Sequence, residues 1–185
     1  MTKLNNIEFY TSPEGGILIK KQGEVIREMS ESDTDLINNL FERIRNDYPE
    51  AFKSLNTCYQ KSERNFTYFR FLCVRRFIKC NFSNYDTLSD DIDSTGQFHF
   101  EQVQCPMRGE CLGYNVICNA KYNTKLSTRE MQILELYCKP MEMSEIANEL
   151  FISPATVDVH VRKIREKLDI HDKAGLVKFY ENKMR

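Results

Sequence analysis

Three short runs near the start of the chain alternate apolar with polar side chains. They are Ile7–Tyr10, Gly16–Lys20 and Glu24–Arg27, and the segments between them hold Pro13-Glu14-Gly15-Gly16 and Gln22-Gly23. A period of two residues is typical of strands with one buried face, and proline and glycine are typical of tight turns. The pattern therefore predicts a small antiparallel hairpin or a three-stranded meander.

The period then lengthens to that of a helix. After the capping-rich segment Ser30–Asp33, apolar residues recur at helical spacing: Leu36, Ile37, Leu40, Phe41 and Ile44. Pro49 ends this helix and can open a second one. An aromatic and basic stretch, Asn65–Cys80, predicts a third helix, and Gln97–Val103 is expected to be a strand.

The last third of the chain has the clearest helix signals. Ser127-Thr128-Arg129-Glu130 is a capping box, and the helix that it opens stops before Pro140. A second helix, about Met143–Phe151, is expected to bury Ile146, Ala147, Leu150 and Phe151. Ser153 can cap a third helix with Pro154 at its first position. Two short helices with so tight a joint predict a helix-turn-helix unit.

The third helix, Pro154–Leu168, has two distinct faces. At 100° per residue its aliphatic residues form one narrow stripe that must face the core: Val157, Val161, Ile164 and Leu168. The opposite face presents Ala155, Asp158, Val159, Arg162 and Glu166. A solvated structural helix would explain this polar face, but a β-branched residue gains nothing from water.

Binding in a DNA groove would explain the outward face of this helix. Val159 could contact a thymine methyl group, and Arg162 could reach a guanine edge. A polar and cationic flank could contact phosphates: Thr156, His160, Lys163 and Lys167.

Several spaced blocks of this region resemble the LuxR/GerE/NarL-type helix-turn-helix. They are Leu126–Glu130, Glu145–Ser153, Thr156–Ile164 and Lys167-Leu168, within roughly 60 residues from about 125 to 184. The resemblance implies binding to double-stranded DNA, usually as a homodimer, with base contacts from Asp158, Val159 and Arg162. It also implies a dimer contact on the fourth helix, Lys173–Asn182, which Asp172 would cap. The candidate interface residues are Ala174, Val177 and Tyr180.

The sequence departs from that family at three positions. Pro140 replaces the glycine usual between the first two helices, and Glu142 replaces the usual polar N-cap of the second. Asp158 stands where lysine is common. A carboxylate there repels phosphate, so it must accept a hydrogen bond from cytosine N4 or weaken binding.

A chain of 185 residues can form one domain or two small ones. We expect an α+β protein: a hairpin-plus-helices domain with a Cys-rich loop over residues 1–120, then an all-α four-helix domain over 121–185, with the connector Ala120–Lys125 at the boundary. Residues 121–185 hold 12 Lys/Arg and 10 Asp/Glu, whereas residues 1–120 hold 14 and 17. This weak asymmetry suits a DNA-binding domain that depends on local contacts.

Other features narrow the function class. Residues 1–10 lack a signal-peptide pattern and no apolar run is long enough to span a bilayer, so we expect a cytoplasmic protein without membrane contact. No phosphate-binding glycine loop or Gly-x-Ser-x-Gly motif is present, and the three histidines have no evident nucleophile partner. We expect no enzymatic activity.

Seven cysteines, without a secretory signal, favour reduced thiols. Four of them could supply thiolates to zinc: Cys80, Cys105, Cys111 and Cys118. An iron–sulfur cluster also takes four thiolates, His99 could replace Cys80, and unligated thiols remain an alternative. Cys73 and Cys138 fall in helical apolar patterns and are interpreted as core residues.

The sequence thus predicts a sequence-specific transcriptional regulator with an amino-terminal sensing or interaction domain. The alternative is an adaptor that uses the helix-turn-helix to bind a protein, such as RNA polymerase or another regulator. The stretch Asn65–Cys80, where aromatics alternate with arginines, could also stack on nucleic acid. An amphipathic helix that fills the core is the simpler interpretation.

Overall fold

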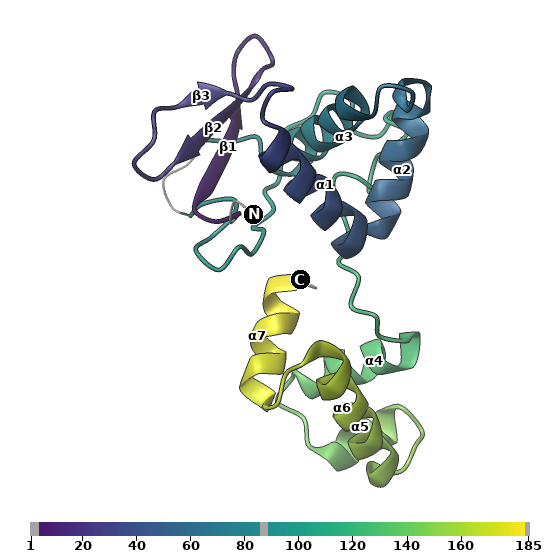
Figure 1. Cartoon of the computed structure of the whole chain (residues 1–185). Coiled ribbons are helices and arrows are strands. Elements are labelled where there is room, and N and C mark those ends of the chain that lie inside the picture. The colour runs from purple at the N-terminus through teal and green to yellow at the C-terminus, as the bar shows by residue number, and fades with distance from the viewer. Residues whose placement is uncertain (1–3, 86–88, 184–185) are drawn as a thin grey trace. The chain divides into compact units, whose positions relative to one another are not determined.

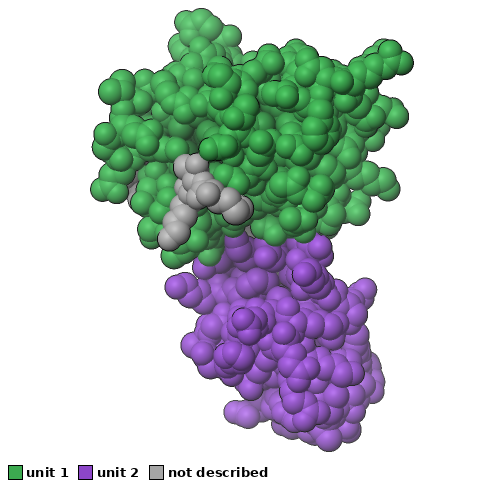
Figure 2. All heavy atoms as spheres, viewed as in Figure 1, with its two compact units in different colours: residues 1–121 green, residues 122–185 purple. Residues whose placement is uncertain are grey.

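The computed structural model describes residues 4–85 and 89–183. Met184, the far limit predicted for the helix-turn-helix region, lies outside them. The chain divides into two compact units, Met1–Lys121 and Tyr122–Arg185, coloured separately in Figure 2. Within the described ranges, every helix is too short or too polar to cross a bilayer.

The first unit begins with the predicted three-stranded sheet (Figure 1). β1 (Ile7–Thr11), β2 (Ile17–Lys21) and β3 (Arg27–Glu28) pair antiparallel in the order β1-β2-β3. Gly15, at φ +83°, adopts the left-handed conformation that the β1–β2 turn needs. The alternating apolar residues of β1 and β2 are buried: Ile7, Phe9, Ile17 and Ile19. The third predicted run, Glu24–Arg27, reaches β3 only at Arg27, and its Val25 is 87% exposed.

Three helices follow: α1 (Thr34–Asp47), α2 (Pro49–Tyr59) and α3 (Phe66–Asn81), with a short 3-10 turn, Gln60–Ser62, before α3. The five apolar residues predicted for α1 are buried. α3 contacts both other helices and also β1 and β2, so it joins the sheet to the helices. Its inward residues Phe69, Val74 and Phe77 are buried, as expected of an amphipathic core helix.

The predicted strand at Gln97–Val103 is wrong. Phe98 makes only an isolated bridge to Ile92, which in turn bridges Ile7 of β1. The backbone N–H of Glu101 donates to Asn81 O, the last residue of α3, at 2.9 Å. Phe98 and Phe100 instead pack in a ring cluster with Tyr48, Phe77 and Phe82. The alternation of apolar and polar residues in this segment therefore reflects the packing of aromatic rings and not strand pairing.

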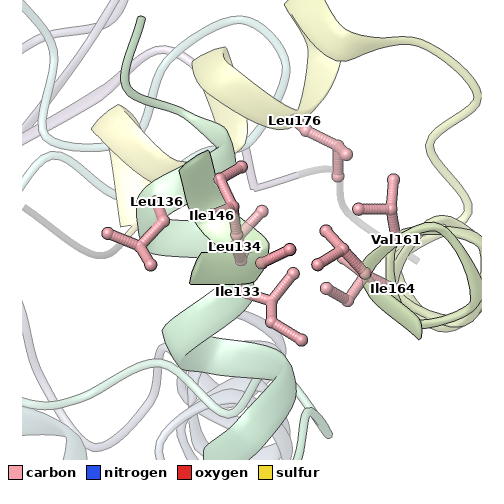
Figure 3. Packing of buried hydrophobic residues seen from close by; sticks show 9 residues of the cluster. Ile133, Leu134, Leu136, Ile146, Val161, Ile164 and Leu176 are labelled. Atoms are coloured by element: carbon pink, nitrogen blue, oxygen red, sulfur yellow. The ribbon is translucent and has the colours of Figure 1, made fainter. Parts of the chain in front are cut away.

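The second unit is all-helical, as predicted: α4 (Thr128–Tyr137), α5 (Met143–Glu149), α6 (Pro154–Leu168) and α7 (Lys173–Lys183). Its core combines residues from all four helices. Figure 3 shows Val161 and Ile164 of α6 pointing toward Ile133 of α4, with Leu176 of α7 closing the cluster. The small N-terminal sheet followed by helices, and the helical C-terminal unit, confirm the α+β class.

Candidate nucleic-acid interface

α6 begins where the sequence predicts. The Ser153 hydroxyl accepts a hydrogen bond from the Thr156 backbone N–H at 3.1 Å, and Pro154 occupies the first turn, where no amide partner is needed. Val157, Val161 and Ile164 are buried, and Leu168 is half-buried against the same cluster. The helix ends at Asp169, whose φ of 55° is left-handed.

Because one side of α6 is buried, the opposite side is fixed toward solvent. Asp158, Val159 and Arg162 are all exposed, and 37% of Val159 is accessible. The structure therefore brings the three predicted base-contacting residues together on one accessible helix face.

The flank of α6 is less uniform than the sequence suggests. Lys163 is exposed, whereas Thr156 and His160 are half-buried. The Thr156 hydroxyl lies 2.8 Å from the Ser153 hydroxyl, so it contributes to the helix cap. The His160 Nδ1 atom is buried, and among the described residues it has no hydrogen-bond partner.

Lys167, the last residue of the predicted flank, is tied to the first helix of the unit. Its Nζ atom donates to Glu130 Oε2 at 2.7 Å, and the same oxygen accepts from the Ser127 backbone N–H at 2.7 Å. Burial raises the pKa of Glu130, but the hydrogen bonds from Lys167 and Ser127 outweigh it and lower that pKa to about 2. The capping-box glutamate therefore stays ionised and also positions the end of α6.

The joint between α5 and α6 corrects one prediction. α5 ends at Glu149, and Phe151, expected to be buried, is 95% exposed. Its φ of 54° turns the chain out of the helix, and the Ile152 N–H returns to Ala147 O at 2.9 Å. Arg129 of α4, which the sequence does not single out, donates to Leu150 O at 2.6 Å and fixes this joint.

The departures at Pro140 and Glu142 leave this architecture intact. Glu142 precedes α5, and its backbone N–H donates to Glu145 Oε2 at 2.7 Å. The carboxylate of Glu145 thus satisfies an amide at the start of α5.

Comparison with known proteins agrees with this architecture. Residues 124–180 match the family model described as bacterial regulatory proteins, luxR family. This segment is a LuxR-family domain.

The similar curated proteins are bacterial regulators. A nitrate/nitrite response regulator protein homolog from Haemophilus influenzae is 40% identical over 57 residues, which are 30% of this chain and 27% of that protein. The oxygen regulatory protein NreC of Staphylococcus carnosus is 43% identical over 54 residues, 29% and 25% of the two chains. The probable transcriptional regulatory protein NarL of Mycobacterium tuberculosis is 38% identical over 52 residues, 28% and 24%.

The chain therefore spans about a quarter of the length of the curated relatives that it matches. No solved structure gives a significant match. The similarity to the relatives covers 28% to 30% of this chain and so leaves most of the first unit without a comparison.

α7 of the LuxR-family domain carries the predicted dimer residues. Asp172 accepts a hydrogen bond from the Gly175 N–H at 2.6 Å, as expected of a capping residue. Ala174 is exposed, Val177 is half-buried, and Tyr180 is half-buried against the domain's own core. Ala174 and the accessible part of Val177 are thus the more available of the three.

The cysteines predicted to bind metal lie in the first unit and are reduced: Cys80, Cys105, Cys111 and Cys118. Arg76 donates to Cys111 Sγ at 3.0 Å. In residues 4–85 and 89–183, no three His, Cys, Asp or Glu side chains stand close enough to hold a metal ion. His99, the alternative to Cys80, lies 3.0 Å from Asp93 Oδ2 through its Nε2 atom.

Cys73, Cys138 and the aromatic stretch pack as core elements. Cys73 is buried, and burial raises the pKa of its thiol to about 12. Burial likewise raises the pKa of Cys138 to about 11. On α3 the Arg70 guanidinium stacks over Phe66, 4.1 Å from the ring centroid, so this exposed aromatic already has a cationic partner.

Proposed function

We propose that this protein is a sequence-specific DNA-binding transcriptional regulator that places α6 in the major groove. The observation that carries the proposal is the outward face of α6, where Asp158, Val159 and Arg162 lie exposed on a LuxR-family domain. The names of the similar proteins, which include a transcriptional regulatory protein and a response regulator homolog, support it.

Each exposed residue suits a different contact. Arg162 can donate two hydrogen bonds to a guanine, and Val159 can pack on a thymine methyl group. Asp158 would accept from a cytosine amine, which makes it a specificity residue that weakens general phosphate attraction. Lys163 is exposed beside this face and is the strongest candidate for a phosphate contact, with Thr156 and His160 as weaker ones. Lys167, held by Glu130, would contribute charge more than a direct contact.

The regulator is proposed to act in the cytoplasm as a homodimer on paired half-sites. α7 would supply the contact through Ala174, Val177 and Tyr180. Because a dimer places two α6 helices on one face of the duplex, the bound sites should contain two related half-sites.

The decisive experiment is in-vitro selection of bound DNA with the full-length protein. The wild type should enrich a motif, and the double variant Val159→Glu/Arg162→Glu should lose it. Lys53→Glu, a charge change of the same sign on an exposed residue of α2, should retain the motif. Enrichment by neither wild type nor control would overturn the proposal.

Salt titrations separate the roles of the individual residues. Lys163→Ala should weaken binding to all sequences and reduce the salt slope by about 1. Asp158→Lys should raise nonspecific affinity and steepen the salt dependence. An unchanged slope in Asp158→Lys would place that residue away from the DNA.

An adaptor that binds RNA polymerase or another regulator is the second candidate function. In that function the phenyl ring of Phe151, which is 95% exposed just before α6, would make the contact with the partner protein. In that case DNA selection would fail while Phe151→Ser would disrupt a protein complex.

A further inference from the structure

The loop 104–119 has little hydrophobic support. Among the apolar side chains of this loop only Ile117 is buried, whereas Leu112 is 94% exposed and Met107 52% exposed. The backbone is a series of turns without a helix or strand. Hydrophobic burial therefore does not explain why the loop takes one conformation.

Backbone and side-chain contacts hold the loop against the end of α3. Asn81, which follows Cys80, donates to the carbonyl of Ile117, which precedes Cys118, at 3.0 Å. Arg76, one turn before Cys80, donates to Cys111 Sγ at 3.0 Å. Cys80 and two loop cysteines are thus brought to the same end of one helix.

The turn between Cys105 and Cys111 adds the fourth thiol. The Arg108 N–H donates to Cys105 O at 3.2 Å, and the Cys111 N–H donates to Met107 O at 3.1 Å. The hydrogen bonds of Arg76 and Asn81 thus hold Cys111 and Cys118 at the end of α3 where Cys80 lies, and the turn joins Cys105 to Cys111.

The surroundings of Cys111 in particular suit a thiolate. Cys111 Sγ accepts a hydrogen bond from the Gly113 N–H at 3.3 Å in addition to the one from Arg76. Backbone N–H groups and a guanidinium offset negative charge on sulfur. A Cβ atom at Gly113 would lie 2.5 Å from Ile117 Cδ1, so the glycine lets the Ile117 side chain pack against this turn.

From these contacts we propose that Cys80, Cys105, Cys111 and Cys118 form a structural zinc site that fixes the loop on the C-terminal end of α3. Zn²⁺ prefers four tetrahedral thiolates in structural sites. Ligation forms four Zn–S bonds and releases the thiol protons to solvent, so no oxidant or reductant is required. The thiols do not stand at ligating distances. Binding must therefore bring the four thiols closer together.

The test is the metal content of the full-length protein, purified under reducing conditions, with zinc and iron measured together. The wild type should hold about one zinc per chain. Cys111→Ser and Cys118→Ser should lose it, whereas Cys58→Ser, at an exposed cysteine of α2, should retain it. Zinc retained in both site variants would overturn the proposal, and so would stoichiometric iron with visible absorbance.

A measurement on the wild type keeps the proposal testable if the serine variants do not fold. Replacing the bound metal with Co²⁺ should give the visible bands of a tetrahedral four-thiolate complex. A wild type that holds no zinc and binds Co²⁺ without those bands has no such site. Because the site lies in the first unit, Val159→Glu/Arg162→Glu should leave the metal content unchanged, which separates this result from that of the DNA experiment.

Discussion

The LuxR-family domain and the loop 104–119 reach a defined conformation in opposite ways. In the domain, four helices contribute to one cluster, and three of the four aliphatic residues of the α6 stripe, Val157, Val161 and Ile164, are between 0% and 3% exposed. In the loop, Ile117 is the single buried apolar side chain, and hydrogen bonds to Asn81 and Arg76 provide much of the attachment. Burial of apolar side chains, which has no preferred direction, specifies the conformation of the domain, and directional polar contacts specify that of the loop.

The largest effect should come from the domain core. Ile133→Ala, at a residue that is 0% exposed, should lower the free energy of unfolding of the domain by about 3 kcal/mol. Hydrogen exchange resolved by peptide should show faster exchange across α4–α7 and little change in α1–α3. A loss below about 1 kcal/mol would mean that burial is not what holds the domain together.

The next effect concerns the ion pair between the buried Glu130 and the exposed Lys167. Glu130→Gln should cost about 2 kcal/mol at neutral pH, because it removes the charge that Lys167 and Ser127 stabilise. The folded pKa of Glu130, about 2, lies below its ordinary value of 4.5. The contribution is therefore complete above pH 4.5 and is lost as the pH falls toward 2. Urea unfolding of both proteins from pH 7 to pH 3 should show the difference shrinking; a constant difference would contradict the pKa argument.

A smaller effect is expected where the loop meets α3. Asn81→Ala removes the hydrogen bonds to Phe77 O and Ile117 O and should cost about 1 kcal/mol. Limited proteolysis should cleave the loop faster in this variant. Glu110→Ala, at an exposed residue of the same loop, is the control and should behave like the wild type. Equal cleavage in the two variants would show that Asn81 does not anchor the loop.

The smallest effect should come from the exposed side of the loop. Leu112→Ser should change the free energy of unfolding by less than about 0.5 kcal/mol, because the side chain is already 94% exposed. Thermal unfolding is a sufficient measurement. A clear destabilisation would mean that Leu112 is buried in solution, and the contrast between the two regions would then disappear.

The same contrast explains how far the sequence could predict the structure. Periodic burial is visible in a sequence, so the strands of the sheet and the helices of both units were predictable, including the N-cap at Ser153 and the capping box at Ser127. An alternation of apolar and polar residues does not reveal whether another strand offers a free edge with which the segment can pair. For that reason Gln97–Val103 was wrongly predicted as a strand, while Phe98 and Phe100 were filling an aromatic cluster.

Contacts between residues that are distant in the sequence could not be predicted either. Nothing near Lys167 indicates that its partner is Glu130, and nothing near Arg129 indicates that it binds Leu150 O. The exposed position of Phe151 depends on a left-handed backbone angle that phenylalanine rarely adopts. The exposed face of α6 was predictable because the buried stripe determines it. Its DNA contacts, like the metal site, remain predictions.

The bond between Lys167 and Glu130 has a consequence for the orientation of α6. An apolar stripe by itself allows a helix to rotate somewhat about its own axis, because apolar contacts have no preferred direction. The Lys167 ammonium group, bound to Glu130 near the end of the helix, restricts this rotation, since a charged hydrogen bond weakens quickly when its geometry changes. The angle at which Asp158, Val159 and Arg162 meet any partner is thereby set from α4, on the other side of the domain's core.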